Sequence, residues 1–339
     1  MKTLWGGVAA GCLALAMLYA GPARADAVED FYRGKNVSLV TPDAAGGGYD
    51  TYGRLVGRYI GEFIPGKPNI VPQNMPGAGG VTQMNYLYNV APKDGSAFAI
   101  VMHGTIFKPV LDPREVRYKV DTFRWLGSVT PIAVIGVFRK DAPASTAKEL
   151  FEREVIIGGS GGTTMYLPLA INRVLGTKLK LVKGYKNTND IMLATARNEV
   201  QGVVGIGLDS LRGSRAAGDV ETRILFQMGT TRSHSLPDVP LIQEFARNND
   251  DREVLEAIFA SFSIGRVFMA PAIPDDRYAA LKTAFEKTVR DPRFVAQAEK
   301  EHAEVDYVSP DAIQQIIAHV YSQPEPVLKR AAAAMVGGE

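Results

Sequence analysis

Residues 37–64 read VSLVTPDAAGGGYDTYGRLVGRYIGEFI, which is an apolar run, a glycine loop and a periodic segment in immediate succession. The run at 37–40 predicts a strand, and residues 51–64 place their apolar side chains on one face of a helix. The glycines at 46–48 lie between strand and helix. Without a Cβ, such residues let backbone N–H groups turn toward an anion at the positive end of the helix dipole. This junction therefore predicts an anion-binding loop.

The glycine pattern recurs at two later junctions. Residues 77–80 read GAGG and residues 158–164 read GGSGGTT, each between a short apolar run and a helical pattern. A further strand predicted at 97–102 runs into His103 and Thr105. Repeated strand, loop and helix imply parallel strands with right-handed crossovers, whose ligands bind beyond the carboxyl ends of the strands. We expect the loops of one sheet to share one edge.

The chain is too long for a single hydrophobic core. A predicted signal peptide of 25 residues leaves 339 − 25 = 314 residues, which favours two α/β lobes with parallel or mixed sheets. The strand and helix pattern restarts after residues 132–138, and we expect the helices after Asp275 to pack back on the first lobe. Two crossings, near Val137 and Gly265, would make a hinged clamp. The predicted boundaries are 26–137 plus 266–339 for the first lobe and 138–265 for the second.

The N-terminus predicts export. Lys2 precedes an apolar run at 8–19, and an A-x-A cleavage site follows, which places cleavage of a secretory signal peptide between Ala25 and Asp26. No later stretch is long and uncharged enough to span a membrane, so we expect a soluble periplasmic protein. Cys12 is the only cysteine, and its removal with the signal leaves no disulfide or thiol chemistry.

The charge balance excludes two classes of partner. The chain has 38 basic and 36 acidic residues, and the signal contains one Lys and one Arg, so 38 − 2 = 36 basic residues remain against 36 acidic ones. This balance argues against nucleic acid and against an anionic membrane surface. The four histidines lack metal-ligand spacing, and we expect neither a metal nor a cofactor.

Several short motifs occur in a fixed order along the chain. They are FYRGK at 31–35, GGGYD at 46–50, QNMPGAGG at 73–80, APKDG at 91–95, WLG at 125–127, GY at 184–185 and MAP at 269–271. This ordered set resembles the extracytoplasmic solute-binding proteins of tripartite tricarboxylate transporters. The resemblance covers nearly all of the mature chain and is densest from residue 31 to residue 95.

The resemblance implies a two-crossover periplasmic-binding-protein fold, similar to type II, that closes on a di-, tri- or aromatic carboxylate. It also implies a monomer without catalytic activity that delivers this ligand to a membrane permease. In that family the loops at 46–50 and 76–80 hold one carboxylate through backbone amides and ordered water, and the loop at 160–164 closes from the other lobe. The residues predicted to bind ligand are Ala45, Gly46, Gly47, Gly48, Tyr49, Asp50, Gly77, Ala78, Gly79, Thr105, Ser160, Gly161, Gly162, Thr163, Thr164 and Asp209.

Asp43 and Ala45 depart from the family pattern, which often has an apolar residue and a proline at these positions. A carboxylate is an unexpected neighbour for an anion. Asp43 either hydrogen-bonds the loop itself, which we favour, or indicates a ligand that has a cationic or donor group beside its carboxylate. The alternatives concern the identity of the ligand and leave the class of protein unchanged.

Some predicted residues have a structural alternative. Asp50, Thr163 and Thr164 either contact ligand or cap the helices that they begin. Asp209 and Ser210 fit a helix N-cap as well as contact with a ligand hydroxyl or amine. For three further residues we favour a role in packing over contact with a ligand. They are His103, Tyr49 and Tyr185.

Two other functions use the same features. An exported hydrolase could use Ser160 within the G-x-S-x-G-like sequence at 158–162, with a later histidine as base. Neither a Walker A sequence nor a complete dinucleotide loop follows Gly48. The other function is a sensor, whose closed form docks on a receptor kinase instead of a permease. A sensor and a transport receptor would have the same sequence features, so the sequence alone leaves that alternative open.

Overall fold

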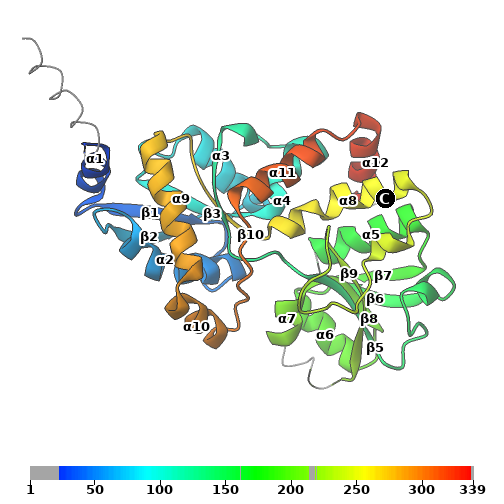
Figure 1. Cartoon of the computed structure of the whole chain (residues 1–339). Coiled ribbons are helices and arrows are strands. Elements are labelled where there is room, and N and C mark those ends of the chain that lie inside the picture. Colours follow the sequence, from blue (N-terminus) through cyan, green and yellow to red (C-terminus); the bar gives the residue numbers. More distant parts are fainter. Residues whose placement is uncertain (1–22, 161, 214–217, 219, 337–339) are drawn as a thin grey trace, which may run out of the picture.

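The computed structural model describes residues 23–160, 162–213, 218 and 220–336, and it contains two α/β lobes (Figure 1). Each lobe has one five-stranded sheet, which confirms the predicted two-lobed α/β fold. Most of the predicted signal peptide lies outside the described residues. The predicted cleavage site at Ala25 and Asp26 falls within helix α1 (Ala23–Tyr32), and cleavage there stays a prediction.

The first sheet has the strand order β2-β1-β3-β10-β4. Its strands are β1 (Asn36–Thr41), β2 (Asn69–Asn74), β3 (Ala97–Met102), β4 (Arg124–Ser128) and β10 (Arg266–Ala270). Strand β1 is parallel to β2 and β3, whereas β10 is antiparallel to β3 and β4. The loops that follow β1, β2 and β3 therefore leave the sheet at one edge, as the sequence predicts.

The second sheet repeats this arrangement in the order β7-β6-β8-β5-β9. Its strands are β5 (Val134–Arg139), β6 (Val155–Gly159), β7 (Leu179–Lys183), β8 (Gly202–Gly207) and β9 (Thr222–Met228). Strand β6 is parallel to β7 and β8, and β5 is antiparallel to β8 and β9. The loop after β6 and the residue Asp209 after β8 consequently lie at the same edge of this sheet.

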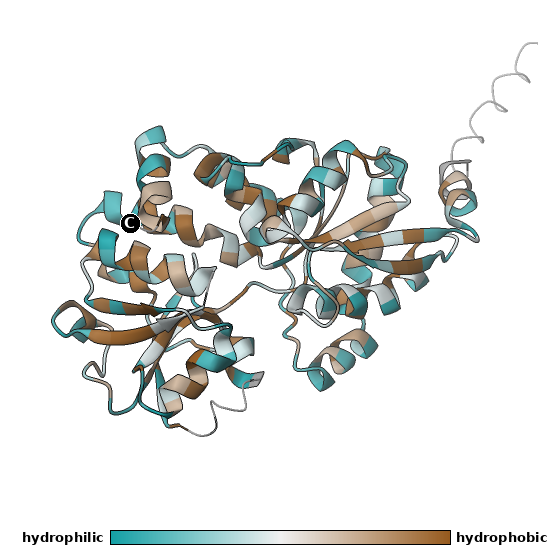
Figure 2. Cartoon of the chain, turned by 180° about the vertical axis from the view of Figure 1, so that it is seen from behind, coloured by the Kyte–Doolittle hydropathy of each residue, from teal (hydrophilic) through white to brown (hydrophobic). Residues whose placement is uncertain are grey.

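Helices cover both sheets, and the hydropathy of the chain follows this layering (Figure 2). In α2, the side chains of Leu55, Val56 and Ile60 are fully buried on one face, which is the face that the sequence predicts. Full burial of one such side chain contributes roughly 1.5–3 kcal/mol. The other helices of the first lobe are α3 (Val81–Asn89), α4 (His103–Leu111), α9 (Asp275–Arg290), α10 (Pro292–Lys300) and α11 (Pro310–Tyr321), and those of the second are α5 (Thr163–Leu175), α6 (Thr188–Ala196), α7 (Leu208–Gly213) and α8 (Asn249–Ile264).

The chain crosses between the two sheets at residues 129–133 and again at Gly265. The first crossing is earlier than the expected position near Val137, because β5 already pairs with β8 and β9 of the second sheet. At the second crossing, Gly265 has φ +40°, and a Cβ there would lie 2.2 Å from the carbonyl oxygen of Thr130. The two crossing segments thus touch at a point that only glycine fits.

Helix α12 (Glu325–Met335) differs from the expectation that every C-terminal helix covers the first lobe. It packs mainly on α5 and α8, and the side chains of Ala331 and Ala334 are buried in the core of the second lobe. Arg173 of α5 donates to the carbonyl oxygens of Ala333 and Ala334 at 2.8 and 3.1 Å. Small side chains allow this close approach, so α12 forms a further connection between the lobes after the two crossings.

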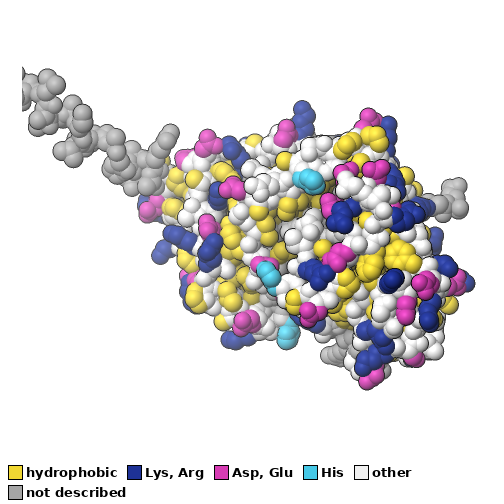
Figure 3. All heavy atoms as spheres, turned by 45° about the vertical axis from the view of Figure 1, so that its right-hand side comes forward, with side chains coloured by type: hydrophobic (Ala, Val, Ile, Leu, Met, Phe, Trp, Pro, Cys, Tyr) yellow, Lys and Arg dark blue, Asp and Glu magenta, His cyan; other side chains and the backbone are white. Residues whose placement is uncertain are grey.

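Two general properties of the molecule bear on its partners. Among the described residues, none of the helices combines the length and the apolar character that crossing a membrane requires. In the space-filling view, basic and acidic side chains are interspersed over the visible face (Figure 3). That face therefore has no large patch of a single charge.

Candidate ligand-binding site

The first glycine loop is held by the carboxylate of Asp50, at the beginning of α2. Asp50 has a side chain that is 2% exposed, and it accepts hydrogen bonds from the Gly46 N–H at 2.8 Å and from Asn74 Nδ2 at 2.8 Å. Arg54, one helical turn away, donates from Nε at 2.9 Å. Burial alone would raise the pKa of Asp50, but the hydrogen bonds from Arg54, Gly46 and Asn74 lower it below its usual range. Asp50 thus ties the loop to α2 and to the end of β2.

Asp43 provides a second carboxylate to the same loop. Its Oδ2 accepts the N–H of Tyr49 at 2.9 Å, one residue into α2. A Cβ on Gly47 would lie 2.5 Å from that oxygen, so glycine is required there for the close approach. The local hydrogen bond that we favoured from the sequence is therefore present. A protein carboxylate occupies the helix terminus at which the sequence predicts a ligand anion.

The amides of this first loop are largely used within the protein. Gly46 and Tyr49 donate to carboxylates, and Gly47 donates to the carbonyl oxygen of Ala44 at 3.1 Å. The N–H groups of Ala45 and Gly48 have no hydrogen-bond partner among the described residues. Gly48 is exposed. Two amides of this loop are thus available to a ligand.

The second glycine loop has a different backbone. Gly77, Ala78, Gly79 and Gly80 all have positive φ, at 143°, 45°, 60° and 91°. The Gly80 N–H donates to the Gly77 carbonyl at 2.9 Å, whereas the N–H groups of residues 77–79 have no partner within the described chain. Residues 77–79 are exposed. Successive exposed amides in a turn of this kind form a concave site for an anion.

The residues after β3 lie between the two loops and the second lobe. The hydroxyl of Thr105 donates to the Met102 carbonyl at 2.6 Å and is buried, so its proton is used inside the protein. The His103 ring packs edge-on against Phe262 of α8, with centroids 5.2 Å apart. Burial and then the charge of Arg266 lower the pKa of His103 to about 3. Its imidazole is therefore neutral at pH 7, and its buried Nδ1 has no hydrogen-bond partner among the described residues.

In the second lobe, the predicted loop opens helix α5. The Ser160 N–H donates to Thr164 Oγ1 at 3.0 Å, and the two hydroxyl oxygens are 3.4 Å apart. Gly162, with φ 51°, precedes the first turn of α5, and Thr163 is its first residue. Gly161 lies outside the described residues. Thr164 therefore stabilises its own loop from within the helix. The helix-capping alternative for Thr163 and Thr164 is not met, because the N-cap of α5 is Gly162, which makes no side-chain cap hydrogen bond.

Tyr49 of the first lobe and Tyr166 of the second lobe are close enough to interact electrostatically. Burial, and then the nearby Tyr49 hydroxyl, raise the pKa of Tyr166, which lies on α5. Tyr185 packs in the second lobe near Gly158, so the structure gives it a packing role.

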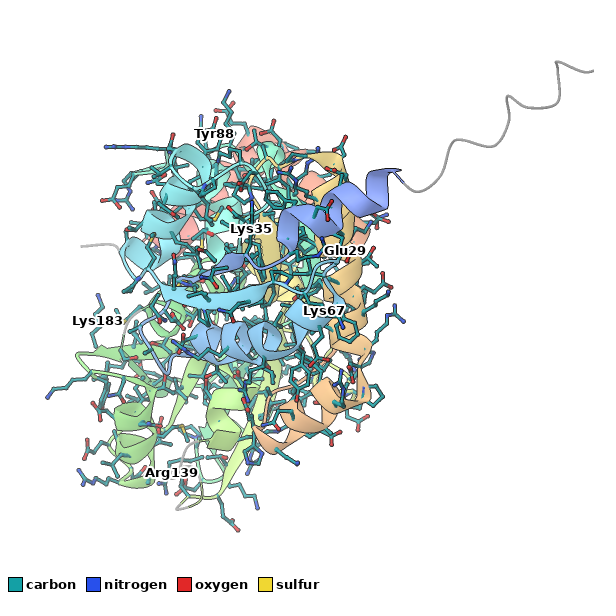
Figure 4. The ribbon with its side chains drawn as sticks, turned by 90° about the vertical axis from the view of Figure 1, so that its left-hand side faces the viewer. Glu29, Lys35, Lys67, Tyr88, Arg139 and Lys183 are labelled. Atoms are coloured by element: carbon teal, nitrogen blue, oxygen red, sulfur yellow. The ribbon has the colours of Figure 1, made fainter. Side chains whose placement is uncertain are left out.

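Viewed from the side of the first lobe, Lys183 at the end of β7 lies near the boundary between the lobes, and Arg139 lies at the far end of the second lobe (Figure 4).

A buried arginine that sequence reasoning missed joins this region. Arg266, the first residue of β10, is 8% exposed, and its guanidinium lies over the rings of Tyr49 and Tyr52, at 4.5 and 5.0 Å from their centroids. Its Nη2 donates to Asp209 Oδ2 at 3.2 Å, across the lobes. The sequence signal was an arginine inside the apolar run 262–269. The family resemblance implies a site of backbone amides and ordered water, and it does not point to this arginine.

A cavity of about 810 Å³ lies beside the two crossings. It is lined by the crossing segment 130–133, by the chain after β9 and by the connection between α10 and α11. Of the predicted ligand-binding residues that the structure describes, Asp209 alone lines it. None of the described residues of the glycine loops lines this cavity.

The described contacts bear on the alternative of an enzyme. Ser160 interacts with Thr164, and no hydrogen bond joins it to a histidine in the described part of the chain. A serine nucleophile needs a base within hydrogen-bond reach. Within the same residues, no group of three or more His, Cys, Asp or Glu side chains could hold a metal ion.

Comparison with known proteins yields a consistent set of matches. The model of the tripartite tricarboxylate transporter family receptor matches residues 64–332. A UPF0065 protein from the TAR-I ttuE-ttuC′ intergenic region of Agrobacterium vitis is 25% identical over 298 residues, which cover 85% of this chain and 82% of that protein.

Solved structures show the same fold. A TctC solute-binding protein from Polaromonas, with no ligand, superposes with a TM-score of 0.67 at 16% identity, covering 87% of this chain and 98% of that one. A Rhodopseudomonas palustris protein with adipate superposes with a TM-score of 0.62 at 22% identity, covering 88% of this chain and 97% of that one. At these identities the likeness establishes the fold.

Proposed function

This chain belongs to the tripartite tricarboxylate transporter receptor family, a family of periplasmic solute-binding receptors, and on that premise we propose that it captures a small carboxylate between its lobes and delivers it to the membrane permease of such a transporter. The ligand is a di-, tri- or aromatic carboxylate. Binding closes the two lobes because the closed form makes contacts with the ligand from both sides. The protein performs no chemistry on the ligand.

The observation that carries this proposal is the second glycine loop. Residues 77–79 are exposed, their N–H groups have no partner among the described residues, and the loop leaves the same sheet edge as the first glycine loop. Amides that the fold already orients stabilise an anion without reorganisation at the moment of binding. The Gly48 N–H lies at the N-terminus of α2, where the helix dipole adds to the attraction.

The adipate bound to the Rhodopseudomonas palustris structure supports the ligand class, because that protein shares the fold over nearly its whole length. A dicarboxylate suits a cleft between two lobes, since each lobe can contact one end of the molecule. The second-lobe contacts predicted from the sequence are the loop at 160–164, where α5 begins, and Asp209.

A thermal-shift screen of di-, tri- and aromatic carboxylates on extensively dialysed protein tests the proposal. A ligand at a hundred times its Kd stabilises the native state by about 2.7 kcal/mol, which is a clear shift in Tm. Amino acids and sugars serve as controls. If every carboxylate is silent while amino acids or sugars stabilise the protein, carboxylate binding is wrong.

Delivery to a permease requires a separate experiment. Deletion of the gene should abolish uptake of the carboxylate that stabilises the purified protein, and a plasmid copy should restore it. Uptake that persists, together with a lost transcriptional response to the same carboxylate, would identify the protein as a sensor.

A further inference from the structure

Arg266 is a buried cation in the space between the lobes. It follows the Gly265 crossing directly, and its side chain is 10% exposed. The rings of Tyr49 and Tyr52 lie against the guanidinium and keep water from it. Burying a guanidinium is costly unless carboxylates or other acceptors satisfy its N–H groups.

The pairing of this cation is incomplete. Arg266 makes one hydrogen bond to a carboxylate, from Nη2 to Asp209 Oδ2, and at 3.2 Å this bond is long for a charged pair. Asp209 comes from the second lobe, its side chain is 33% exposed, and its Oδ1 accepts the N–H of Ser210 at 2.7 Å. An arginine that binds a carboxylate well usually does so with two parallel hydrogen bonds. Arg266 therefore retains capacity for a better-placed carboxylate.

The groups around Arg266 suit an anion. A Cβ on Gly48 would lie 3.3 Å from Arg266 Nη2, which places the guanidinium beside a residue whose N–H has no partner in the described part of the chain. A pocket of about 10 Å³, room for about one water molecule, is lined by Arg266, Asp209 and Tyr52 among others. The N–H of His103 donates to the hydroxyl of Tyr49 at 3.4 Å, so this residue lies at the tyrosine that covers Arg266, and its buried Nδ1 has no hydrogen-bond partner among the described residues.

We propose that the Arg266 guanidinium binds a carboxylate of the ligand and that the Asp209 carboxylate occupies this position in the unliganded protein. The ligand carboxylate replaces Asp209 on the guanidinium and also accepts the N–H of Gly48, which has no partner among the described residues. This inference rests on the proposed function and adds to it a charged receptor for the anion. It also gives Asp209 a role opposite to the direct ligand contact predicted from the sequence.

The consequence is an exchange between the lobes. Without ligand, Asp209 of the second lobe is attached to Arg266 of the first lobe. With ligand, the carboxylate replaces Asp209 on Arg266 and the second lobe contacts the ligand instead. Removing the Asp209 charge should therefore favour the ligand, whereas a purely structural ion pair predicts the reverse sign.

Isothermal titration calorimetry with adipate tests the exchange, with citrate and benzoate used in turn if adipate does not bind. We expect Asp209→Asn to bind about tenfold more tightly, because the amide keeps the Ser210 contact but competes poorly for Arg266. Arg266→Lys should bind at least tenfold more weakly, since lysine lacks the planar fork. Far-ultraviolet circular dichroism establishes that both variants fold.

Arg139 and Asp141 provide the matched control, because they also pair a guanidinium with an aspartate, at 2.7 Å, but at the far end of the second lobe and with Asp141 exposed. Asp141→Asn should leave the affinity within twofold of the wild type. Weaker binding by Asp209→Asn, or unchanged binding by Arg266→Lys, would overturn the exchange. Absence of any binding by the wild type would instead contradict the proposed function itself, and the inference with it.

Discussion

The two glycine loops of the first lobe begin from the same sequence signal and end with different chemistry. In the loop at 43–50, the carboxylates of Asp43 and Asp50 accept the N–H groups of Tyr49 and Gly46. In the loop at 77–80, the first three N–H groups have no partner within the described chain. The first loop is mainly a rigid support, and the second has the more open set of donors.

This difference shows that glycine content alone does not measure the capacity of a loop for an anion. Glycine provides the backbone freedom, but a carboxylate four residues away can use the same amides. Both loops lie at one sheet edge, so a ligand bound there would contact both of them. Most N–H groups of the first loop are used within the protein, whereas those of residues 77–79 in the second loop have no partner among the described residues. Substitutions that affect one loop and spare the other test this distinction.

The largest expected effect is on binding at the second loop. Gly79→Val should weaken carboxylate binding at least a hundredfold, about 2.8 kcal/mol, because a branched side chain covers the free amides. Gly46→Val is the matched control: both glycines have positive φ, 60° and 83°, and a Cβ at either meets nothing within 4 Å. Calorimetry with the carboxylate identified in the thermal-shift screen should give a clearly smaller loss of affinity for Gly46→Val, because within the described chain only the N–H groups of Ala45 and Gly48 are open in its loop. Equal losses in the two variants would remove the distinction between the loops.

The next effect concerns the stability of the first loop. Asp50→Ala removes the acceptor for Gly46, Asn74 and Arg54, and it should lower the free energy of unfolding by about 2 kcal/mol. Asp30→Ala is the control, because Asp30 pairs with Arg33 on the surface at 64% exposure, where an ion pair contributes little. Urea unfolding followed by circular dichroism measures both. A loss no larger than that of the control would mean that Asp50 does not support the loop.

Asp43 tests whether the protein carboxylate competes with the ligand. Asp43→Asn keeps an oxygen for the Tyr49 N–H but removes a negative charge beside the site, so affinity for a carboxylate should rise about tenfold, or about 1.4 kcal/mol. Asp141→Asn removes a comparable charge beside Arg139, at the far end of the second lobe (Figure 4), and should change nothing. If Asp43→Asn instead weakens binding, the charge of Asp43 serves the ligand, as a cationic or donor group on it would require.

Much of the fold follows from local patterns in the sequence. Alternating apolar runs and helical periodicity predict β1, α2, β3 and the parallel order of the first strands, because these depend on residues near one another. The position of α12 could not be predicted in this way. Its alanines pack equally well on either lobe by pattern alone, and the contact with α5 joins residues about 160 positions apart.

The site shows the same limit. The glycine loops were recognisable, but the use of their amides depends on where the carboxylates of Asp43 and Asp50 point. The pair of Arg266 and Asp209 joins two lobes and 57 positions of sequence. An arginine within an apolar run was the one available signal, and its partner could be found only in three dimensions.

The smallest expected effect is the acid response of the first loop. The pKa of Asp50 is lower in the folded protein than in the unfolded chain, so its ionised form stabilises the fold above the unfolded pKa, near 3.9, and this contribution is lost as the pH falls through the folded pKa. Asp50→Asn lacks the charge at every pH. The wild type should therefore exceed this variant in unfolding free energy by about 1 kcal/mol at pH 6, the difference between charged and neutral hydrogen bonds. The gap should close toward pH 2, as Asp50 protonates.

Because other carboxyl groups titrate equally in both proteins, the difference between the two urea midpoints isolates Asp50. A gap that stays constant from pH 6 to pH 2 would show that the charge of Asp50 does not hold the loop, and the two glycine loops would then differ only in shape.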